Sequence, residues 1–176
     1  MADLSKLPEK ILVQKFKEIC LNNPTIYAKI GKEKTSDGTR QRSIYYNRST
    51  PVGKVFPTLN YHVTMQASEE QIPADACILS ITAYADKEQV ESYDVLSELI
   101  GAIHNKINNH PQQFEEVETS PKRGLHCVQC TRTFKSECDF DEVNKVYFIT
   151  ATYKMTISTH KDNFGVTNNQ EWNPLI

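Results

Sequence analysis

The chain of 176 residues is poor in glycine and has no strong excess of charge of either sign. Its six glycines form no glycine-rich motif that could hold a phosphate group. The net charge of −2 indicates neither a basic nucleic-acid-binding protein nor a polybasic membrane-binding one. No stretch approaches the roughly 18 uninterrupted apolar residues of a transmembrane helix. The N-terminus also lacks the apolar run of a signal peptide, so we expect a cytosolic product with no membrane partner.

The sequence also lacks the short motifs of common enzymes, such as G-x-S-x-G and H-E-x-x-H. His62 and His110 have no acidic or nucleophilic partner at a recognisable spacing. His104 lies one residue past the apolar stripe of the second helix, and we expect a solvated or partly packed residue there instead of a general base. The five cysteines are odd in number, which argues against a disulfide framework. We therefore predict a protein that is not an enzyme and binds no cofactor. An active site assembled from residues far apart in the sequence is the alternative that motifs cannot exclude.

What is present is an ordinary globular composition, with 39% apolar and 24% charged residues. We predict a single domain over residues 1–158. Residues 159–176 form a polar C-terminal tail by composition, apart from Phe164, Trp172, Leu175 and Ile176.

Two segments have the apolar spacing of amphipathic helices. Residues 5–22 place Leu7, Ile11, Leu12, Phe16, Ile19 and Cys20 on one face. Residues 86–108 do the same with Val90, Tyr93, Leu96, Ile100, Ile103 and Ile107. Gln89 follows Asp86 at the spacing of a capping box, which predicts that the second helix begins at Asp86.

The remaining periodic segments predict strands, at residues 25–31, 42–47, 55–66, 76–85, 112–119, 125–135 and 145–158. Residues 76–85 are apolar on both faces, which predicts a central strand covered on both sides. In the last strand, Val146, Phe148, Thr150, Thr152, Lys154 and Thr156 face one way. The opposite face, with Tyr147, Ile149, Ala151, Tyr153, Met155 and Ile157, is the more apolar.

This order of helix, strands, long helix and strands predicts an α+β fold. We expect an antiparallel sheet of about four to six strands, with an N-terminal helix and one long central helix packed on one face. Residues 32–54 form a basic loop or hairpin in this scheme, with a turn at Asp37-Gly38.

The segment 29–48 is the most basic part of the chain, with Lys29, Lys32, Lys34, Arg40, Arg42 and Arg48. Tyr45 and Tyr46 lie among these cations. A solvated hairpin and an assembly arm that orders against a neighbouring subunit fit this composition equally well. Nucleic-acid binding, in which the tyrosines stack on bases, fits it less well. A small acidic cluster at Glu115, Glu116 and Glu118 is interpreted as a solvated strand edge.

Cys127 and Cys130 form the one pattern that suggests metal or thiol chemistry. A zinc ion takes about four nitrogen or sulfur ligands, and His126 and Cys138 lie nearby in the sequence. In a regular strand, however, positions three apart point to opposite faces. We therefore predict buried structural cysteines, with no metal bound, and keep a small zinc- or thiol-binding module as an alternative.

The order of elements resembles that of the tail-terminator, or tail-completion, family of long-tailed bacteriophages. The resemblance is carried by Val55-Phe56-Pro57-Thr58-Leu59-Asn60-Tyr61 and by the strand at residues 78–86 that runs into a long helix. It covers residues 5–158, and the closing strands end at residues 146–157.

This resemblance implies a structural virion protein with no catalytic residues, located in the tail or neck and assembled in the host cytoplasm. Such subunits form a homo-oligomeric ring, commonly of six copies, that caps the tail tube and joins it to the head. The implied partners are the tail-tube protein and the head–tail connector or neck proteins. Genome DNA would pass through the ring without sequence-specific contacts. Another neck, head-completion or tail-tube component is the alternative within this class.

A ring requires head-to-tail contacts between different surfaces of neighbouring copies. We expect the contact residues to be Arg40, Arg42, Tyr45 and Tyr46 of the basic segment, together with Trp172, Leu175 and Ile176 of the tail. The three tail residues are apolar and fit an interface better than solvent.

Overall fold

The computed structural model describes residues 8–34, 40–47, 55–66, 75–88, 91–117 and 123–160. Its helices are α1 (Pro8–Asn22), α2 (Pro24–Lys29), α3 (Ser92–Ile107) and the short 3₁₀ helix η2 (Pro111–Phe114). Its strands are β1 (Lys32–Lys34), β2 (Arg40–Arg42), β3 (Ile44–Tyr46), β4 (Thr58–Gln66), β5 (Asp75–Asp86), β6 (Glu116–Val117), β7 (Arg123–Lys135), β8 (Asp139–Asp141) and β9 (Val146–His160). None of the described helices is long and apolar enough to cross a membrane.

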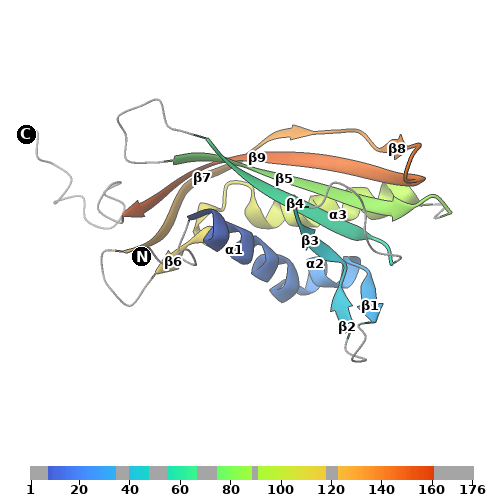
Figure 1. Cartoon of the computed structure of the whole chain (residues 1–176), viewed down its shortest axis with the longest axis horizontal. Helices are drawn as coiled ribbons and strands as arrows, with labels where there is room; N and C mark the ends of the chain where they lie inside the picture. The colour runs from blue at the N-terminus through green and yellow to red at the C-terminus, as the bar shows by residue number, and fades with distance from the viewer. Residues whose placement is uncertain are drawn as a thin grey trace, which may run out of the picture.

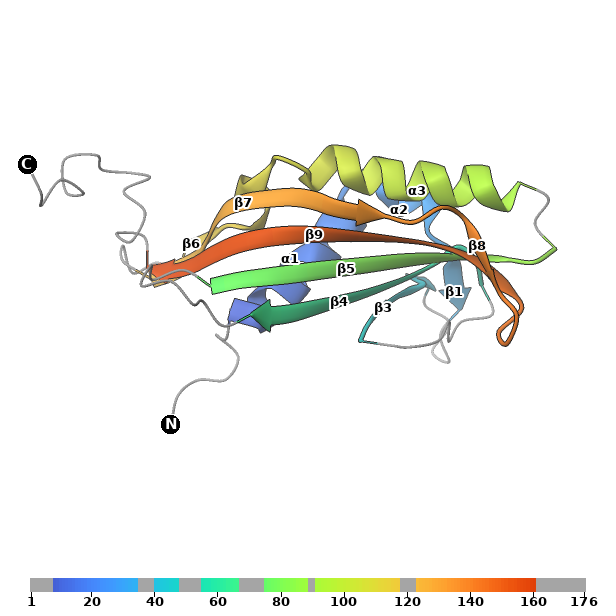
Figure 2. The same ribbon diagram turned by 90° about the horizontal axis from the view of Figure 1, so that it is seen from above.

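The main sheet has seven strands in the order β3-β4-β5-β9-β7-β6, with β8 also paired to β9. All neighbours pair antiparallel except β3 and β4, which run parallel. The helices lie on one side of this sheet (Figures 1 and 2). The predicted α+β class, with an N-terminal and a central helix packed on one face, is confirmed.

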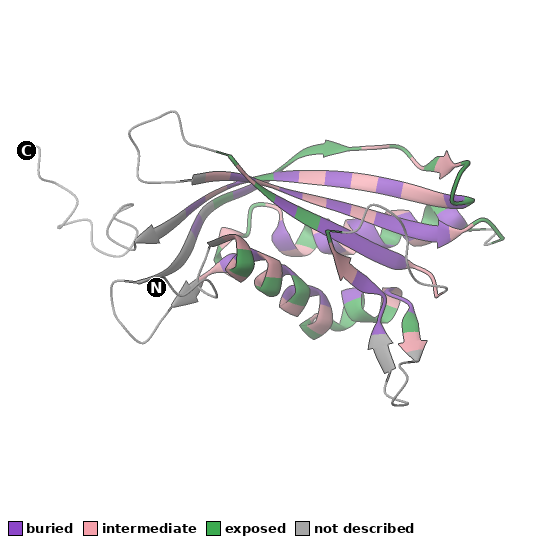
Figure 3. Cartoon of the chain, in the orientation of Figure 1, coloured by how far each residue is buried: buried purple, intermediate pink, exposed green. Residues whose placement is uncertain are grey.

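The hydrophobic core lies between the helices and one face of the sheet. Burial alternates along the strands, as Figure 3 shows, because successive side chains of a strand point to opposite faces. The apolar face predicted for the last strand is confirmed, since Ile149, Ala151, Tyr153, Met155 and Ile157 are all buried. They face the buried stripe of α3, which contains Leu96, Leu99, Ile100, Ile103 and Ile107.

The central position predicted for residues 76–85 is confirmed, because β5 lies between β4 and β9. The expectation that both of its faces are covered is wrong. Cys77, Leu79 and Ile81 are buried under the helices, whereas Ile78 and Ser80 on the other face remain half-exposed. All the described helices lie on one side, so the apolar Ala76 and Ile78 sit on a face that no described helix covers.

The strand predicted at residues 25–31 is wrong, because this segment forms helix α2. The side chain of Asn23 accepts hydrogen bonds from the backbone N–H groups of Thr25 (3.0 Å) and Ile26 (3.1 Å). This N-cap, with Pro24 in the first turn, favours a helix over an extended segment. The helix then buries Ile26 completely in the core.

Two further boundaries differ from the predictions. Asp86 ends β5 instead of starting the second helix, which begins at Ser92. The carboxylate of Asp86 accepts from the backbone of Glu88 (3.2 Å), and its carbonyl accepts from the Ser92 hydroxyl (3.1 Å). These bonds form a turn between strand and helix. The strand predicted at residues 112–119 is instead helix η2 followed by the two-residue strand β6.

Residues 32–54 were predicted to form either a basic loop or a hairpin, and the described part of this segment contains a hairpin. β1 and β2 pair antiparallel as a separate two-stranded sheet, and β3 then joins the main sheet beside β4. Gly31 permits this arrangement because a Cβ atom there would lie 2.8 Å from the carbonyl oxygen of Val55. Residues 35–39 and 48–54 lie outside the described residues.

The contact between α1 and the sheet generates a stability prediction. Phe16 is fully buried, and its ring centroid lies 4.8 Å from that of Tyr61, whose hydroxyl donates to the Val13 carbonyl (3.1 Å). Phe16→Ala should lower the free energy of unfolding by about 3–5 kcal/mol, because it removes buried area and leaves a cavity. Urea denaturation followed by circular dichroism measures this loss. The exposed control Lys17→Ala should change it by less than about 0.5 kcal/mol. A loss below about 1 kcal/mol for Phe16→Ala would contradict this account of the core.

Candidate assembly surface

One broad face of the main sheet points away from the helices, and we call it the open face. Cross-strand pairing places its residues in rows, such as Asn60, Thr82 and Thr150, or His62, Ser80 and Thr152. The viewer of Figure 2 looks towards this side of the sheet. The open face comprises Asn60, His62, Thr64 and Gln66 of β4; Ala76, Ile78, Ser80, Thr82 and Tyr84 of β5; Phe148, Thr150, Thr152, Lys154 and Thr156 of β9; and Gln129, Thr131 and Thr133 of β7.

The open face is rich in hydroxyl groups and poor in charge. Thr82 and Thr150 share a hydrogen bond of 3.0 Å across the strands, and Thr133 and Thr152 share another of 3.0 Å. Among the residues named above, Lys154 is the only Lys, Arg, Asp or Glu, and Asp86 continues the same alternation at the end of β5. Because these four hydroxyls already bond in pairs across the strands, they lose fewer hydrogen bonds to water on burial than free hydroxyls would. The threonine alternation at Thr150, Thr152 and Thr156 was the sequence signal for this face.

A shallow concavity of about 420 Å³ lies on the open face, beside β3. It is lined by Asn47, Asn60, Tyr61, His62, Ser80, Thr82 and Tyr84. Burial raises the pKa of Tyr84, a side-chain hydrogen bond with Asn60 acts in the opposite direction, and the nearby Asp141 raises it further. The phenol is therefore neutral at physiological pH and gives the concavity no ionised nucleophile.

A second concavity, of about 340 Å³, lies between the adjacent ends of α1 and α2 and the end of α3. It is lined by Lys15, Glu18, Ile19, Asn22, Asn23, Pro24, Lys106 and Gln113. Lys15 and Glu18 form an ion pair of 3.7 Å across its edge. Both partners are partly exposed, so this pair contributes little to stability.

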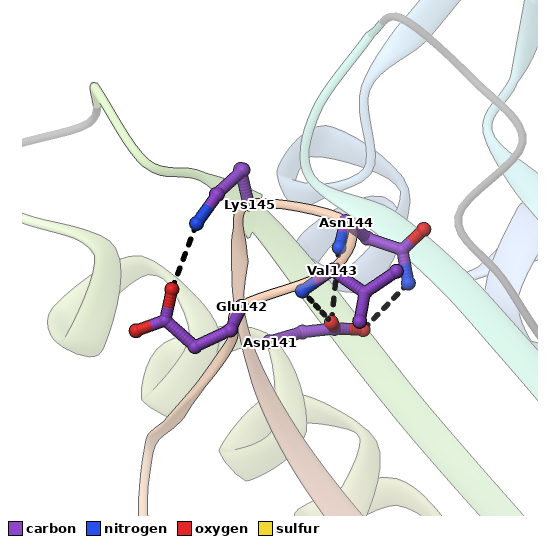
Figure 4. Close-up of polar contacts among 5 residues, drawn as sticks. All are labelled: Asp141, Glu142, Val143, Asn144 and Lys145. Atoms are coloured by element: carbon purple, nitrogen blue, oxygen red, sulfur yellow. Dashed lines mark hydrogen bonds and ion pairs between the residues drawn. The ribbon is translucent and has the colours of Figure 1, made fainter.

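The turn between β8 and β9 carries acidic side chains at one end of the open face. We call residues 139–145 the acidic tip; Asp139, Asp141 and Glu142 lie within it. The Asp141 carboxylate accepts hydrogen bonds from the backbone of Val143 (2.9 Å), the backbone of Asn144 (3.0 Å) and the Asn144 side chain (2.6 Å), as Figure 4 shows. These bonds, those to Asn144 above all, lower the pKa of Asp141. Val143 projects from the tip and is 89% exposed.

The hairpin of β1 and β2, which we call the cationic hairpin, pairs basic residues with one another. Its register places Lys32 opposite Arg42 and Lys34 opposite Arg40. Arg42 is only 7% exposed. Its guanidinium lies 3.6 Å from the ring centre of Tyr27 and donates to the Ile30 carbonyl (2.6 Å). Arg42 therefore fastens the hairpin to α2.

The structure brings part of the predicted contact set together near β2 and β3. Tyr46 is half-buried, its ring packs on Tyr61 (5.5 Å between centroids), and its hydroxyl donates to Glu9 (2.9 Å). Tyr45 is also half-buried. Arg40 lies on β2 opposite Lys34. Trp172, Leu175 and Ile176 lie outside the described residues.

Cys127 and Cys130 both face the helices, so the expectation that they point to opposite faces is wrong. The β7–β9 register shifts between Cys127 and Gln129, which inserts an extra residue and changes the alternation. Cys130 pairs with Met155, whose other neighbour across the sheet is Cys77. A single sequence gives no signal for such a bulge.

The cysteine thiols are neutral in this environment. The Cys127 thiol donates to the Gln129 carbonyl (3.2 Å). Burial raises the pKa of Cys127 well above its ordinary value and that of Cys130 to about 12. Over the described ranges, no three His, Cys, Asp or Glu side chains are grouped so that they could hold a metal ion. The predicted burial of these cysteines is confirmed.

His104 of α3 lies beside the core and is partly packed, as expected. Its Nδ1 lies 3.4 Å from the Tyr153 hydroxyl. Desolvation lowers the pKa of His104, and the nearby Arg132 adds to this effect. The ring is therefore mainly neutral at physiological pH and acts as a packing group on α3.

These features define an α+β protein in which the described helices cover only one face of the sheet. The cationic hairpin lies on the side of α1 and α2, and the acidic tip lies at one end of the open face. No protein-family model and no curated protein matches the chain. A solved structure described as "Virion of native gene transfer agent (GTA) particle" contains a similar chain, with a TM-score of 0.49 and 8% sequence identity. The match covers 81% of this chain and 90% of that chain. A similarity at this level carries no functional inference.

The buried cysteines give a prediction about reactivity. In the native protein at about pH 8, a thiol reagent should modify the half-exposed Cys138 first and leave Cys127 and Cys130 unmodified, because they are buried and protonated. Mass spectrometry of labelled peptides measures the order, with the urea-unfolded protein as the control in which all five cysteines react. Rapid labelling of Cys127 or Cys130, or stoichiometric zinc in the purified protein, would instead favour the zinc- or thiol-binding module.

Proposed function

We propose that this protein is a non-enzymatic structural subunit of a phage-like virion, a tail terminator. In this proposal several copies close into a ring that caps the tail tube and joins it to the head. The observation that carries the proposal is the open face. It is broad, polar and nearly free of charge, and the described part of its own chain leaves it uncovered.

The composition of the open face favours a protein contact over simple solvation. The cores of protein interfaces are depleted in charged residues, whereas a solvated surface usually carries both signs of charge. On the open face, Lys154 is the only Lys, Arg, Asp or Glu between Ala76 and Tyr84 of β5 and along the parts of β4, β9 and β7 named above. The half-buried Phe148 adds aromatic area at one end, where its ring centroid lies 6.2 Å from that of the buried Tyr84.

The arrangement of charge favours a contact between two different surfaces. The acidic tip lies beside the open face, whereas the cationic hairpin projects on the side of α1 and α2 (Figure 1). A ring needs such a head-to-tail contact, in which one surface of each copy meets another surface of the next. A tail terminator is the kind of subunit that requires this contact, as the family resemblance of the sequence implies.

The chemistry of the concavities supports a non-enzymatic role. Both concavities are shallow and widely open to solvent, whereas enzyme pockets bury most of their ligand. The tyrosine and cysteine groups described above have raised pKa values and are neutral at physiological pH. Other neck, head-completion or tail-tube components would share the same surfaces. Only the place where the subunit binds an assembling tail separates them from a tail terminator.

The open face gives the first test of the ring. Light scattering of the purified protein should detect a closed oligomer near six times 20.1 kDa, seen as rings in negative-stain images. Ser80→Lys places an unpaired charge at the centre of the open face, so it should lower the oligomer fraction at a given concentration by about tenfold. The matched control Asn105→Lys changes an exposed position on α3 and should assemble normally. A protein that neither forms an oligomer nor binds tail-tube ends would refute the proposal.

The C-terminal tail gives a second test. Trp172, Leu175 and Ile176 are proposed to dock on a neighbouring copy. Deleting residues 164–176 should therefore weaken the oligomer, as measured by its dissociation on dilution, and leave the circular dichroism spectrum unchanged. The control is Trp172→Phe, which keeps an aromatic anchor and should assemble better than the deletion. An unchanged dissociation constant of the oligomer after the deletion would show that the tail is not part of the contact. The proposed ring would then depend on the open face.

A further inference from the structure

We infer that the acidic tip of one copy docks on the cationic hairpin of the next copy, and that this contact closes the ring. The inference rests on the proposed function and deepens it, because it names the two surfaces that meet. It follows from four observations. The hairpin has a like-charge register, and Lys32 has no acidic partner among the described residues. The tip has a rigid charged form, and it lies at one end of the main sheet whereas the hairpin lies on the side of α1 and α2.

The register of the cationic hairpin is unfavourable for an isolated two-stranded sheet. Lys32 lies opposite Arg42, and Lys34 lies opposite Arg40. Arg42 holds this hairpin to Tyr27 and to the Ile30 carbonyl, but like charges directly opposite one another in an antiparallel pair are still destabilising. Such a hairpin gains stability when an anionic partner neutralises its cations.

The described part of the chain does not supply that partner. Glu33, the acid within β1, lies at the intervening register position opposite Gln41. Lys29, just before the hairpin, is already paired with Glu98 of α3. Lys32 is exposed and forms no ion pair with another described residue. The hairpin therefore presents at least this cation to a partner.

The acidic tip is built as a rigid anionic projection. Three hydrogen bonds to its carboxylate hold Asp141 in the turn and keep it ionised. Lys145 adopts a positive φ of 56° and pairs with Glu142 at 2.8 Å (Figure 4). A turn already held in its bound shape loses little conformational entropy on docking. The tip thus offers Asp139, the exposed Val143 and Glu142, whose solvent-exposed ion pair with Lys145 would be exchanged for one across the contact.

A single copy cannot make this contact within itself. In Figure 1 the cationic hairpin projects below the sheet, with α2, while β8 lies along its upper side. Stacking two copies in the vertical direction of that view brings the tip of one towards the hairpin of the other. The contact is heterologous, so its repetition yields a ring when the rotation between copies closes.

A second copy fits the hairpin better than nucleic acid does. Phosphates of a nucleic acid would neutralise the cations of the hairpin. They would not account for the exposure of the apolar Val143 in the acidic tip. In the proposed contact Val143 packs on the aliphatic stem of Lys32 and on Tyr27, which is 39% exposed beside Arg42. The same contact therefore accounts for an exposed apolar residue and for unpaired charge.

The test is a charge exchange measured by sedimentation velocity. Lys32→Glu and Glu142→Lys should each raise the dissociation constant of the oligomer about tenfold, because each brings like charges together in the contact. The double variant carries both changes in every chain, so opposite charges meet again. Its dissociation constant should return to within about threefold of the wild-type value. In the wild type, raising the salt concentration should weaken assembly, since salt screens exposed charges.

The controls separate folding and surface charge from the contact. Lys17→Glu makes the same charge change at an exposed site of α1 and should assemble normally. The Glu142–Lys145 pair is exposed, so its loss should leave the thermal unfolding midpoint nearly unchanged. Val143→Ser, which leaves every charge in place, should weaken assembly without altering its salt dependence.

Each outcome decides something different. An oligomer that forms equally well in both single variants would overturn the docking inference and leave the ring standing. A wild-type protein that stays monomeric up to about 1 mM and on tube ends would refute the proposed function itself. Binding of a DNA duplex that Lys32→Glu abolishes, together with unaltered assembly, would assign the cationic hairpin to nucleic acid instead.

Discussion

The pairing of β5 with β9 is the constraint on which the rest of the structure depends. Their register runs without a shift from Asp75 opposite Ile157 to Asp86 opposite Val146. Because side chains alternate, this one ladder sends Leu79, Ile81 and Tyr153 towards the helices and Ser80 and Thr152 towards the open face. A slip of a single residue would exchange the two faces and expose the core. The ladder therefore fixes both the packing of α3 and the composition of the open face, the proposed assembly surface.

The sequence predicts this core well because long amphipathic segments carry a strong periodic signal. Periodicity predicted both the apolar face of β9 and the buried stripe from Leu96 to Ile107 of α3. Short elements were not. α2 spans six residues, and what decides it is the side chain of Asn23 bonding to two backbone N–H groups. A hydrogen bond of this kind outweighs the β-branched residues that suggested a strand, and a single sequence does not show that it forms.

The open face also combines features that the sequence predicts with features that only strand pairing decides. The threonine alternation of β9 is visible in the sequence, but its meaning depends on where the helices lie, which is a tertiary property. Burial on both faces was expected for β5 because Ala and Ile occur on both. The bulge that turns Cys127 and Cys130 to one face depends on the β7–β9 register. Pairing between strands decides these features, and no local pattern within either strand encodes it.

One-sided coverage of the sheet links the fold to assembly. With the described helices on one face, the two sides of the molecule differ in shape and in chemistry. One side presents strands with many hydroxyl groups and the acidic tip, and the other presents helices with charges of both signs and the cationic hairpin. Such polarity disfavours the contact of a surface with its own copy and favours contact with the opposite side of a neighbour. A chain with helices on both faces of its sheet would lack this difference. The asymmetry that leaves β5 half-exposed is thus what makes a directional, repeating contact available to the subunit.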